Sequence, residues 1–209
     1  MTCSGAVLSG SAALALVLPG TFVPKDLDFY IPRNRAAMVI TYFEKLEYEL
    51  DPIFSVGAGE YNNGAVVFRM LHLLPFSEIN IVIFLNIVGH ISTFHSMLVM
   101  NYVSWYGLIC LYPDWTEEKK GLIVVDNVYT RLCFDKYKKR GFILLRNNKD
   151  LMEEMNMHLC ERDAECPKTK CCLFNEQCAF RPFQGLPRTL GTFERAVTWI
   201  LGSTCSYAG

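Results

Sequence analysis

The chain has 209 residues, of which 51% are hydrophobic and 20% charged, so it can bury a core in one substantial domain and is not disordered throughout. Twenty basic and 21 acidic side chains give a formal net charge of -1, which excludes a general polyanion binder and does not indicate nucleic acid as a partner. The apolar run from Ile79 to Val88 has about half the length that crosses a bilayer, so we expect no membrane partner.

The first part of the chain predicts the order strand, helix, strand, helix. Residues 6–9 are an apolar stretch typical of a buried strand, and residues 11–18 predict a short helix that Pro19-Gly20 ends. A second strand is predicted over 27–31. Residues 34–46 then place apolar side chains at helical spacing, with Glu and Lys on the other side.

Two more strands follow a turn-rich region. Turns are predicted at Asp51-Pro52 and over 57–64, where Gly and Asn are frequent. The apolar residues of 65–74 predict a strand, and the β-branched run over 79–85 is typical of an interior strand.

The second half of the main region is predicted to be helical. Residues 91–109 predict a long, largely buried helix, and residues 114–140 a helical region that is broken near Gly121. Three Lys and Arg residues before Gly141 are typical of a last helical turn followed by a C′ glycine.

The composition changes near residue 150, so we expect a main domain over 1–149 and a small, irregular, Cys-rich extension over 150–209 that packs on it. Five of the nine cysteines lie between Cys160 and Cys178. Together with His158 they supply enough ligands for zinc, but there is no Cys-x-x-Cys pair, and we expect reduced thiols and no zinc.

The N-terminal residues leave two interpretations of the cellular location. The apolar residues at 6–8 and 12–18 are similar to the core of a secretory signal, which would turn the Cys-rich segment into a disulfide framework. No positive charge precedes them and no small-x-small cleavage site follows. We therefore expect a cytoplasmic protein, with secretion as the alternative.

Two short motifs near the N-terminus indicate a metal-phosphate site. Asp26 and Asp28 are one residue apart among β-forming residues, so both carboxylates point to the same face of a strand. A pair of carboxylates on one face can hold Mg²⁺. Upstream, Gly10-Ser11 opens a helix and offers backbone N–H groups and a hydroxyl to a phosphate.

This pattern, an apolar strand with Gly10-Ser11, a spacer and Asp26-x-Asp28, resembles the signature of the nucleotidyltransferase-fold superfamily. The resemblance implies an α/β fold with a mixed central sheet flanked by helices. It also implies Mg²⁺-dependent transfer of a nucleoside monophosphate from a nucleoside triphosphate to an acceptor of unknown class. Asp26 and Asp28 would be the catalytic metal ligands and Gly10-Ser11 the nucleotide-binding turn. The segments 94–96, 99–101, 111–113 and 199–202, with Cys205, resemble a family of fungal proteins with this fold.

One position departs from the superfamily pattern. A third carboxylate often lies between apolar residues on a later strand, and here Asn80 stands between Ile79 and Ile81. As a metal ligand, Asn80 supplies a carbonyl oxygen but removes one negative charge. Glu78 is expected on the opposite strand face and therefore not as a substitute.

The departure leaves three interpretations: an active nucleotidyltransferase, a catalytically degenerate module that binds a nucleotide or a protein, and an Asp pair that only solvates a strand end. His95 lies in an apolar stretch and is interpreted as a hydrogen-bonded interior or boundary residue rather than a catalyst. The basic residues Lys136, Lys138, Lys139 and Arg140 are interpreted as a solvated helix end in preference to a phosphate or RNA contact.

Overall fold

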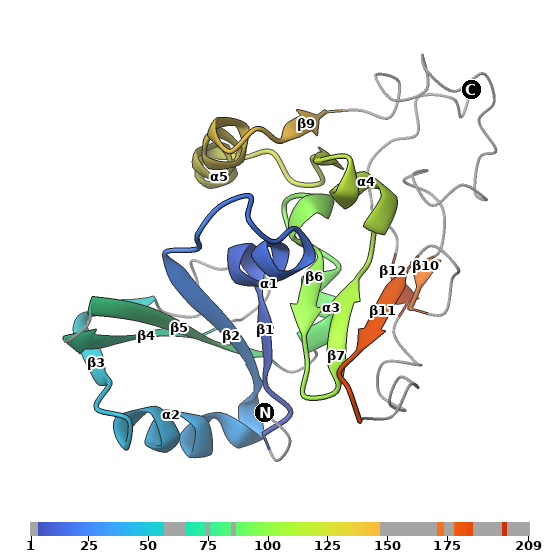
Figure 1. Ribbon diagram of the computed structural model, residues 1–209. Helices are drawn as coiled ribbons and strands as arrows, with labels where there is room; N and C mark the ends of the chain where they lie inside the picture. The colour runs from blue at the N-terminus through green and yellow to red at the C-terminus, as the bar shows by residue number, and fades with distance from the viewer. Residues whose placement is uncertain are drawn as a thin grey trace, which may run out of the picture.

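A mixed eight-stranded sheet forms the centre of the molecule in the computed structural model, which describes residues 4–56, 66–73, 76–84, 87–146, 171–173, 178–185 and 198–199 (Figure 1). The strand order is β11-β7-β6-β1-β2-β5-β4-β3. The strands are β1 (Val7–Ser9), β2 (Asp26–Pro32), β3 (Glu49–Val56), β4 (Val66–Leu73), β5 (Phe76–Phe84), β6 (Asn101–Val103), β7 (Gly107–Cys110) and β11 (Ala179–Pro182). β2 and β5 are parallel and the other neighbours antiparallel, which confirms the predicted α/β class with a mixed central sheet.

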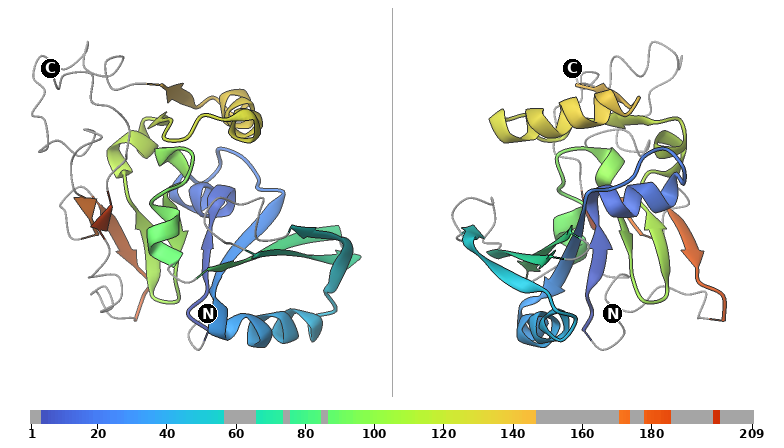
Figure 2. Two further views of the ribbon diagram at one scale, coloured as in Figure 1. Left: turned by 180° about the vertical axis from the view of Figure 1, so that it is seen from behind. Right: turned by 60° about the vertical axis from the view of Figure 1, so that its left-hand side comes forward.

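The helices are short, and smaller strand pairs lie outside the main sheet. The helices are α1 (Gly10–Val17), α2 (Ala36–Glu44), α3 (Ile87–Ile91), α4 (Pro113–Glu117) and α5 (Val128–Lys139), with 3-10 turns at η1 (Arg33–Arg35) and η2 (Met97–Val99). The small pairs are β8 (Lys120–Leu122) with β9 (Ile143–Leu145) and β10 (Cys171–Cys172) with β12 (Thr198–Trp199). Both views of Figure 2 show α5 above α1, and α2 at the far end of the molecule from α5.

The short strand β1 joins the two halves of the sheet. It pairs with β2 on one side and with β6 on the other, where only Leu8 and Ser9 are in register with partners. Ser9 is fully buried, and its hydroxyl donates a hydrogen bond of 2.5 Å to the carbonyl oxygen of Asn101. β1 therefore connects β2 and β5, which carry the predicted site, with β6 and β7, which come later in the chain.

α2 covers one face of the β2–β5–β4 part of the sheet. Its side chains Val39 and Phe43 pack with Ile31, Ile79 and Ile81 in one buried cluster. Since side chains alternate along a strand, the neighbours of these isoleucines, including Asp28 and Asn80, project from the other face. The predicted site and α2 thus lie on opposite sides of the sheet.

The prediction of one long helix over 91–109 is wrong. After α3 and η2, the chain forms the hairpin β6–β7, which turns where the Ser104 N–H donates a bond of 2.9 Å to the carbonyl of Gly107. Every residue of both strands is buried. A strand buried on both faces shows no apolar-polar alternation, and its continuous apolar run looks like a buried helix in the sequence.

Two other sequence predictions are corrected or refined. The turn expected at Asp51-Pro52 is wrong, because β3 runs through it at the edge of the sheet, where a proline is tolerated. The predicted break near Gly121 is confirmed: α4 ends, β8 follows, and α5 begins with Asn127 and Thr130 capping each other reciprocally. Gly141 has a φ of +83°, as expected for a C′ glycine.

Candidate functional site

Asp26 and Asp28 share one face of β2, as the sequence predicted. β5 runs parallel beside β2, and its register places Asn80 next to Asp28 and Glu78 next to Asp26. Neighbouring residues in register project from the same side of a sheet. Four oxygen-bearing side chains therefore gather on two adjacent strands.

Gly10 brings the start of α1 against this face. It has a φ of +66°, and a Cβ atom added there would lie 2.6 Å from Oδ2 of Asp28, so only glycine allows the approach. The next residue, Ser11, donates its hydroxyl hydrogen to Oδ1 of Asp26 over 3.5 Å. The structure thus brings together Gly10, Ser11, Asp26 and Asp28.

The first turn of α1 has no side-chain cap. Its N-cap residue is Ser9, whose hydroxyl makes no capping bond because it is directed to the carbonyl of Asn101 instead. Backbone N–H groups in the first turn of a helix need a partner from outside the helix. They are therefore suited to an anionic oxygen.

Asn80 contacts Asp28 directly. The Asn80 side-chain nitrogen donates a hydrogen bond of 2.9 Å to Oδ1 of Asp28. This bond fixes one carboxylate oxygen of Asp28 and orients the group. Coordination of a metal by the Asn80 carbonyl oxygen stays a prediction.

The expectation that Glu78 lies on the opposite face is wrong. Glu78 precedes Asn80 by two positions, and the two-residue period of a strand puts both on the same face. Arg69 of β4, which is in register with Asn80, forms an ion pair of 3.0 Å with Glu78 and a longer one of 4.0 Å with Asp51. Glu78, the third acidic side chain of this face after Asp26 and Asp28, is therefore paired with the guanidinium group of Arg69.

Burial raises the pKa of Asp28 to about 6. The hydrogen bond from Asn80 opposes the shift, the charge of Asp26 adds to it, and the ammonium group of Lys136 opposes it. A carboxyl group with this pKa is mostly ionised at neutral pH and binds a proton under mildly acidic conditions. Any cation bound by Asp28 competes with that proton.

α5 places Lys136 near the carboxylates. Cys133 and Tyr137 of α5 pack in one cluster with Leu14 and Leu18 at α1. This packing holds α5 against α1, and the first turn of α1 borders the site. Lys136 lies between them in sequence and is close enough to lower the pKa of Asp28. The sequence pattern favours a solvated helix end for the whole basic cluster, Lys136 included. The electrostatic effect of Lys136 on Asp28 depends on the tertiary position of α5, which the sequence does not show.

His95 packs against α5 in an apolar setting. Its ring contacts Phe134 and Tyr137, and its Nδ1 is buried without a hydrogen-bond partner among the described residues. Burial, with a smaller contribution from Lys136, lowers its pKa to about 4. The ring is therefore neutral at pH 7. Its aromatic contacts agree with the interpretation as an interior or boundary residue, but the hydrogen bond expected with it is not made by Nδ1 among the described residues.

Asp26 and Asp28 have the ligand chemistry that suits one magnesium ion. Mg²⁺ prefers oxygen ligands and usually takes one or two carboxylates, completing its shell with water and substrate phosphates. Asp26 and Asp28 supply such oxygens beside the Ser11 hydroxyl. Across the described ranges, no three His, Cys, Asp or Glu side chains are placed to hold a metal by themselves.

Part of the C-terminal cysteine group also lies within the described residues. Cys178 donates its thiol hydrogen to the carbonyls of Leu111 at 3.4 Å and Cys172 at 3.6 Å, and Trp199 donates to the hydroxyl of Tyr112 at 2.9 Å. None of the described cysteines, Cys110, Cys133, Cys171, Cys172 and Cys178, is in a disulfide. His158, Cys160 and Cys166, which the zinc interpretation requires, lie outside the described residues.

Comparison with known proteins gives no family assignment. The chain matches none of the known protein families, and no curated protein is significantly similar to it in sequence. Within the described ranges, the helices are all too short or too polar to cross a bilayer. The functional argument therefore depends on the geometry of the site.

Proposed function

We propose that the chain is a nucleotidyltransferase-like protein that binds a nucleoside triphosphate with Mg²⁺ and transfers its nucleoside monophosphate to an acceptor. The observation that carries the proposal is the contact of Gly10 with Asp28, beside the bond from Ser11 to Asp26. It puts the first turn of a helix, which suits phosphate, against two carboxylates that suit a hard cation. The mixed sheet and the location of Asn80 on the strand parallel to β2 agree with the resemblance.

Each part of the site has a chemical role in this proposal. Asp26 and Asp28 hold the Mg²⁺, which when bound neutralises the phosphates and the leaving pyrophosphate. The N–H groups of the first α1 turn bind phosphate oxygens. Lys136 supplies a positive charge close enough to act on Asp28, and Asn80 keeps the Asp28 carboxylate oriented.

A second candidate function is nucleotide binding without transfer. It is favoured by the polar side chains of β5: Asn80 is neutral and Glu78 is paired with Arg69. Two carboxylates are enough for one cation that accompanies a triphosphate, but two-metal catalysis uses a second ion that must also be held. In this alternative the protein recognises the nucleotide and releases no pyrophosphate.

Thermal unfolding with ATP, GTP, CTP or UTP, each with and without Mg²⁺, tests both candidates. A ligand that binds only the folded state raises the unfolding temperature, so we expect stabilisation that requires Mg²⁺. Asp26→Ala with Asp28→Ala should abolish it. Lys136→Ala should weaken it, whereas Lys138→Ala, which removes a charge from another face of the same helix, should not.

Release of pyrophosphate from a labelled triphosphate then separates transfer from binding alone. Absence of any Mg²⁺-dependent stabilisation would favour the third interpretation, in which the Asp pair only solvates a strand end. We further propose a cytoplasmic location, because the thiols of Cys110 and Cys178 donate hydrogen bonds, as reduced cysteines do.

A further inference from the structure

Positive charge is concentrated in the segment from Asp126 to Arg146, which contains α5. The segment holds six Lys and Arg residues and two Asp residues, a net charge of +4, although the whole chain carries -1. Asp126 is shared by two of the arginines, Arg131 at 3.0 Å and Arg146 at 3.5 Å. The exposed lysines of α5 form no ion pair with an acid of the described residues; they are Lys136, Lys138 and Lys139.

The dipole of α5 accounts for only part of this charge. A helix C-terminus carries about half a negative charge. The last turn of α5 and the residue after it hold four cations, Lys136, Lys138, Lys139 and Arg140. Lys136 and Arg140 are also one turn apart, a spacing at which like charges destabilise a helix. The excess charge therefore indicates an anionic partner in addition to a solvated helix end.

Aromatic rings hold two of these cations in place. The Lys136 ammonium lies 5.1 Å from the centre of the Tyr137 ring, and the Arg140 guanidinium lies 5.5 Å from the same ring and 4.0 Å from that of Phe22. Nη1 of Arg140 is buried and has no hydrogen-bond partner among the described residues. A ring attracts a cation without neutralising its charge. Both positive charges are thus ordered and can still bind an anion.

An exposed aromatic ring belongs to the same row of α5. Tyr129 is 82% exposed, and the steps of seven and four residues from Tyr129 to Lys136 and Arg140 place the three on one side of the helix. Asp135, the only acidic residue of α5, is about 120° round the helix from Tyr129. The row is about 16 Å long, the length of about five nucleotides of a stacked strand.

We propose that this row of α5 binds a single strand of nucleic acid, with Lys136 and Arg140 on the backbone phosphates and Tyr129 stacked on a base. Proteins that bind single strands combine a positively charged surface with exposed rings on which bases stack. In a duplex the bases are already stacked on one another. A helix that lies on a bilayer keeps its cations on the face away from its apolar residues, whereas in α5 the cations and the exposed ring share one row.

The proposed surface shares one residue with the carboxylate site. Lys136 acts on Asp28, whereas Tyr129 and Arg140 belong to the row alone. The inference goes beyond the proposed function and does not depend on it, because the strand is bound by side chains of α5 without a metal. Strand binding measured without nucleotide and Mg²⁺ therefore tests this proposal separately from the proposed function.

Fluorescence anisotropy with the full chain and labelled strands of about 12 nucleotides, oligouridylate and oligodeoxythymidylate, tests the proposal. We expect binding that weakens as NaCl rises from about 50 to 300 mM. Two phosphate contacts predict a slope of about -1.4 in a plot of log affinity against log salt, and Lys136→Gln should reduce its magnitude by about 0.7. Binding of either strand supports the proposal, and the tighter one identifies the sugar.

Substitution of Tyr129 tests the stacking contact. Tyr129→Ala should raise the dissociation constant by about tenfold with little change in the salt slope, because a stacked base is lost and no charge is removed. Tyr129→Trp should keep the affinity of the wild type within about threefold, since it retains a flat ring. The side chain is exposed, so circular dichroism should show the same folded content for both variants.

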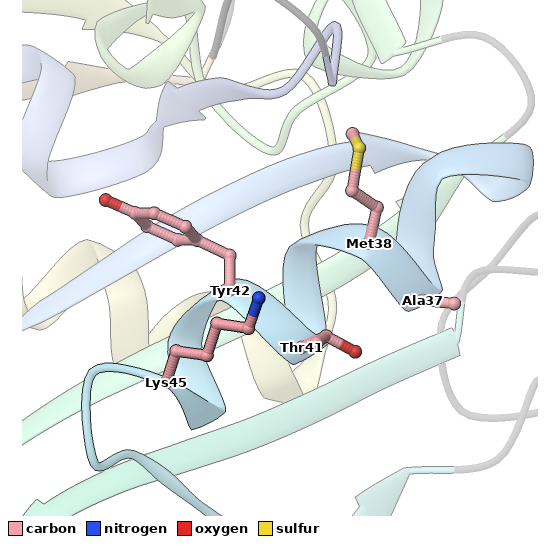
Figure 3. Close-up of a pocket in the computed structure, with 5 residues that line it drawn as sticks. All are labelled: Ala37, Met38, Thr41, Tyr42 and Lys45. Atoms are coloured by element: carbon pink, nitrogen blue, oxygen red, sulfur yellow. The ribbon is translucent and has the colours of Figure 1, made fainter.

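α2 offers a matched control at the far end of the molecule. Figure 3 shows the side chains of Tyr42 and Lys45 standing out beside a cavity of about 390 Å³, so this surface also presents a ring and a cation. Tyr42 is 59% exposed, and Lys45 is exposed as well. Tyr42→Ala with Lys45→Gln should leave strand binding unchanged, because the surface lacks a row of cations.

Four results would overturn the proposal. They are the absence of binding to both strands, tighter binding of a duplex of the same length, equal losses in the α2 control and the α5 variants, and an affinity for Tyr129→Ala equal to that of the wild type. Vesicles with anionic lipid provide the remaining comparison. Binding to these vesicles without binding to the strands would indicate a membrane surface instead.

Discussion

The side-chain amide of Asn80 donates a hydrogen bond of 2.9 Å to the Asp28 carboxylate, across two parallel strands that are 52 residues apart in the chain. The bond gives Asp28 a neutral hydrogen-bond donor at position 80. A carboxylate at that position would repel Asp28 instead. It therefore stabilises the ionised form of Asp28 without a metal.

Asn80→Asp should make the stability of the protein depend on Mg²⁺. Two carboxylates in this contact repel each other, so we expect a loss of about 1–3 kcal/mol at pH 7 without metal. Mg²⁺ should restore much of that loss if Asn80 lies within reach of the ion. Thermal unfolding with increasing Mg²⁺ measures the effect.

Asn80→Ala is the control for that experiment, because it removes the hydrogen bond without adding charge. It should be destabilised by a similar amount and gain no more from Mg²⁺ than the wild type does. Equal responses of Asn80→Asp and the wild type to Mg²⁺ would remove position 80 from the metal site.

Ionisation of Asp28 should cost stability as the pH rises. Burial raises its pKa from the ordinary 3.8 to about 6, so the folded state binds the proton more tightly than the unfolded state. This contribution is fully present below about pH 3.8 and is lost as the pH rises through 6, a change of about 3 kcal/mol.

Asp28→Asn cannot ionise and isolates this contribution. The free energy of unfolding of the wild type, relative to Asp28→Asn, should decrease between pH 4 and pH 7 and then level off. Chemical denaturation at a series of pH values measures the difference. A difference independent of pH would show that Asp28 titrates normally in the folded protein.

Gly10→Ala should displace Asp28 as well as destabilise the chain. The added Cβ meets Oδ2 of Asp28 at 2.6 Å, and a non-glycine residue at φ +66° is strained, so we expect a cost of about 1–3 kcal/mol. Gly20→Ala is a matched control, because Gly20 has a φ of +81° with open space around it. Denaturant unfolding should show the larger loss for Gly10→Ala, and only this variant should lose Mg²⁺-dependent nucleotide binding.

His95 should make the protein sensitive to acid. Burial lowers its pKa from 6.5 to about 4, so the neutral ring contributes stability that is complete above pH 6.5 and is lost as the pH falls through 4. The loss amounts to about 3 kcal/mol. His95→Gln should flatten this part of the stability curve, and Lys136→Ala should flatten it slightly, because the Lys136 charge adds to the shift. If His95→Gln keeps the acid sensitivity of the wild type, another group causes it.

The sequence was sufficient to predict the first part of the fold and four residues of the site. β1, α1, β2 and α2 follow each other closely, and their apolar spacing and turn residues are local signals. Gly10, Ser11, Asp26 and Asp28 belong to that local unit. Their convergence needs only one strand, one helix and the next strand.

The remainder depends on contacts between distant segments. β6 and β7 are buried on both faces, so their apolar run has no period that distinguishes strand from helix. Lys136 reaches the site through the packing of α5 on α1, which no short motif encodes. The ion pair that neutralises Glu78 comes from Arg69, and only the register of β4 with β5 brings the two together.

The three-residue strand β1 makes the candidate site and the sheet a single thermodynamic unit. Its contact with β6 is only two residues long, and the chain passes from it directly into Gly10. α1 packs on β6 and β7 through Ala13 and Val17, so transient separation of β6 from β1 would also disturb α1 and the Gly10-Ser11 turn at its start. A ligand that holds this turn in place would therefore slow amide hydrogen exchange in β6 and β7, which it does not touch.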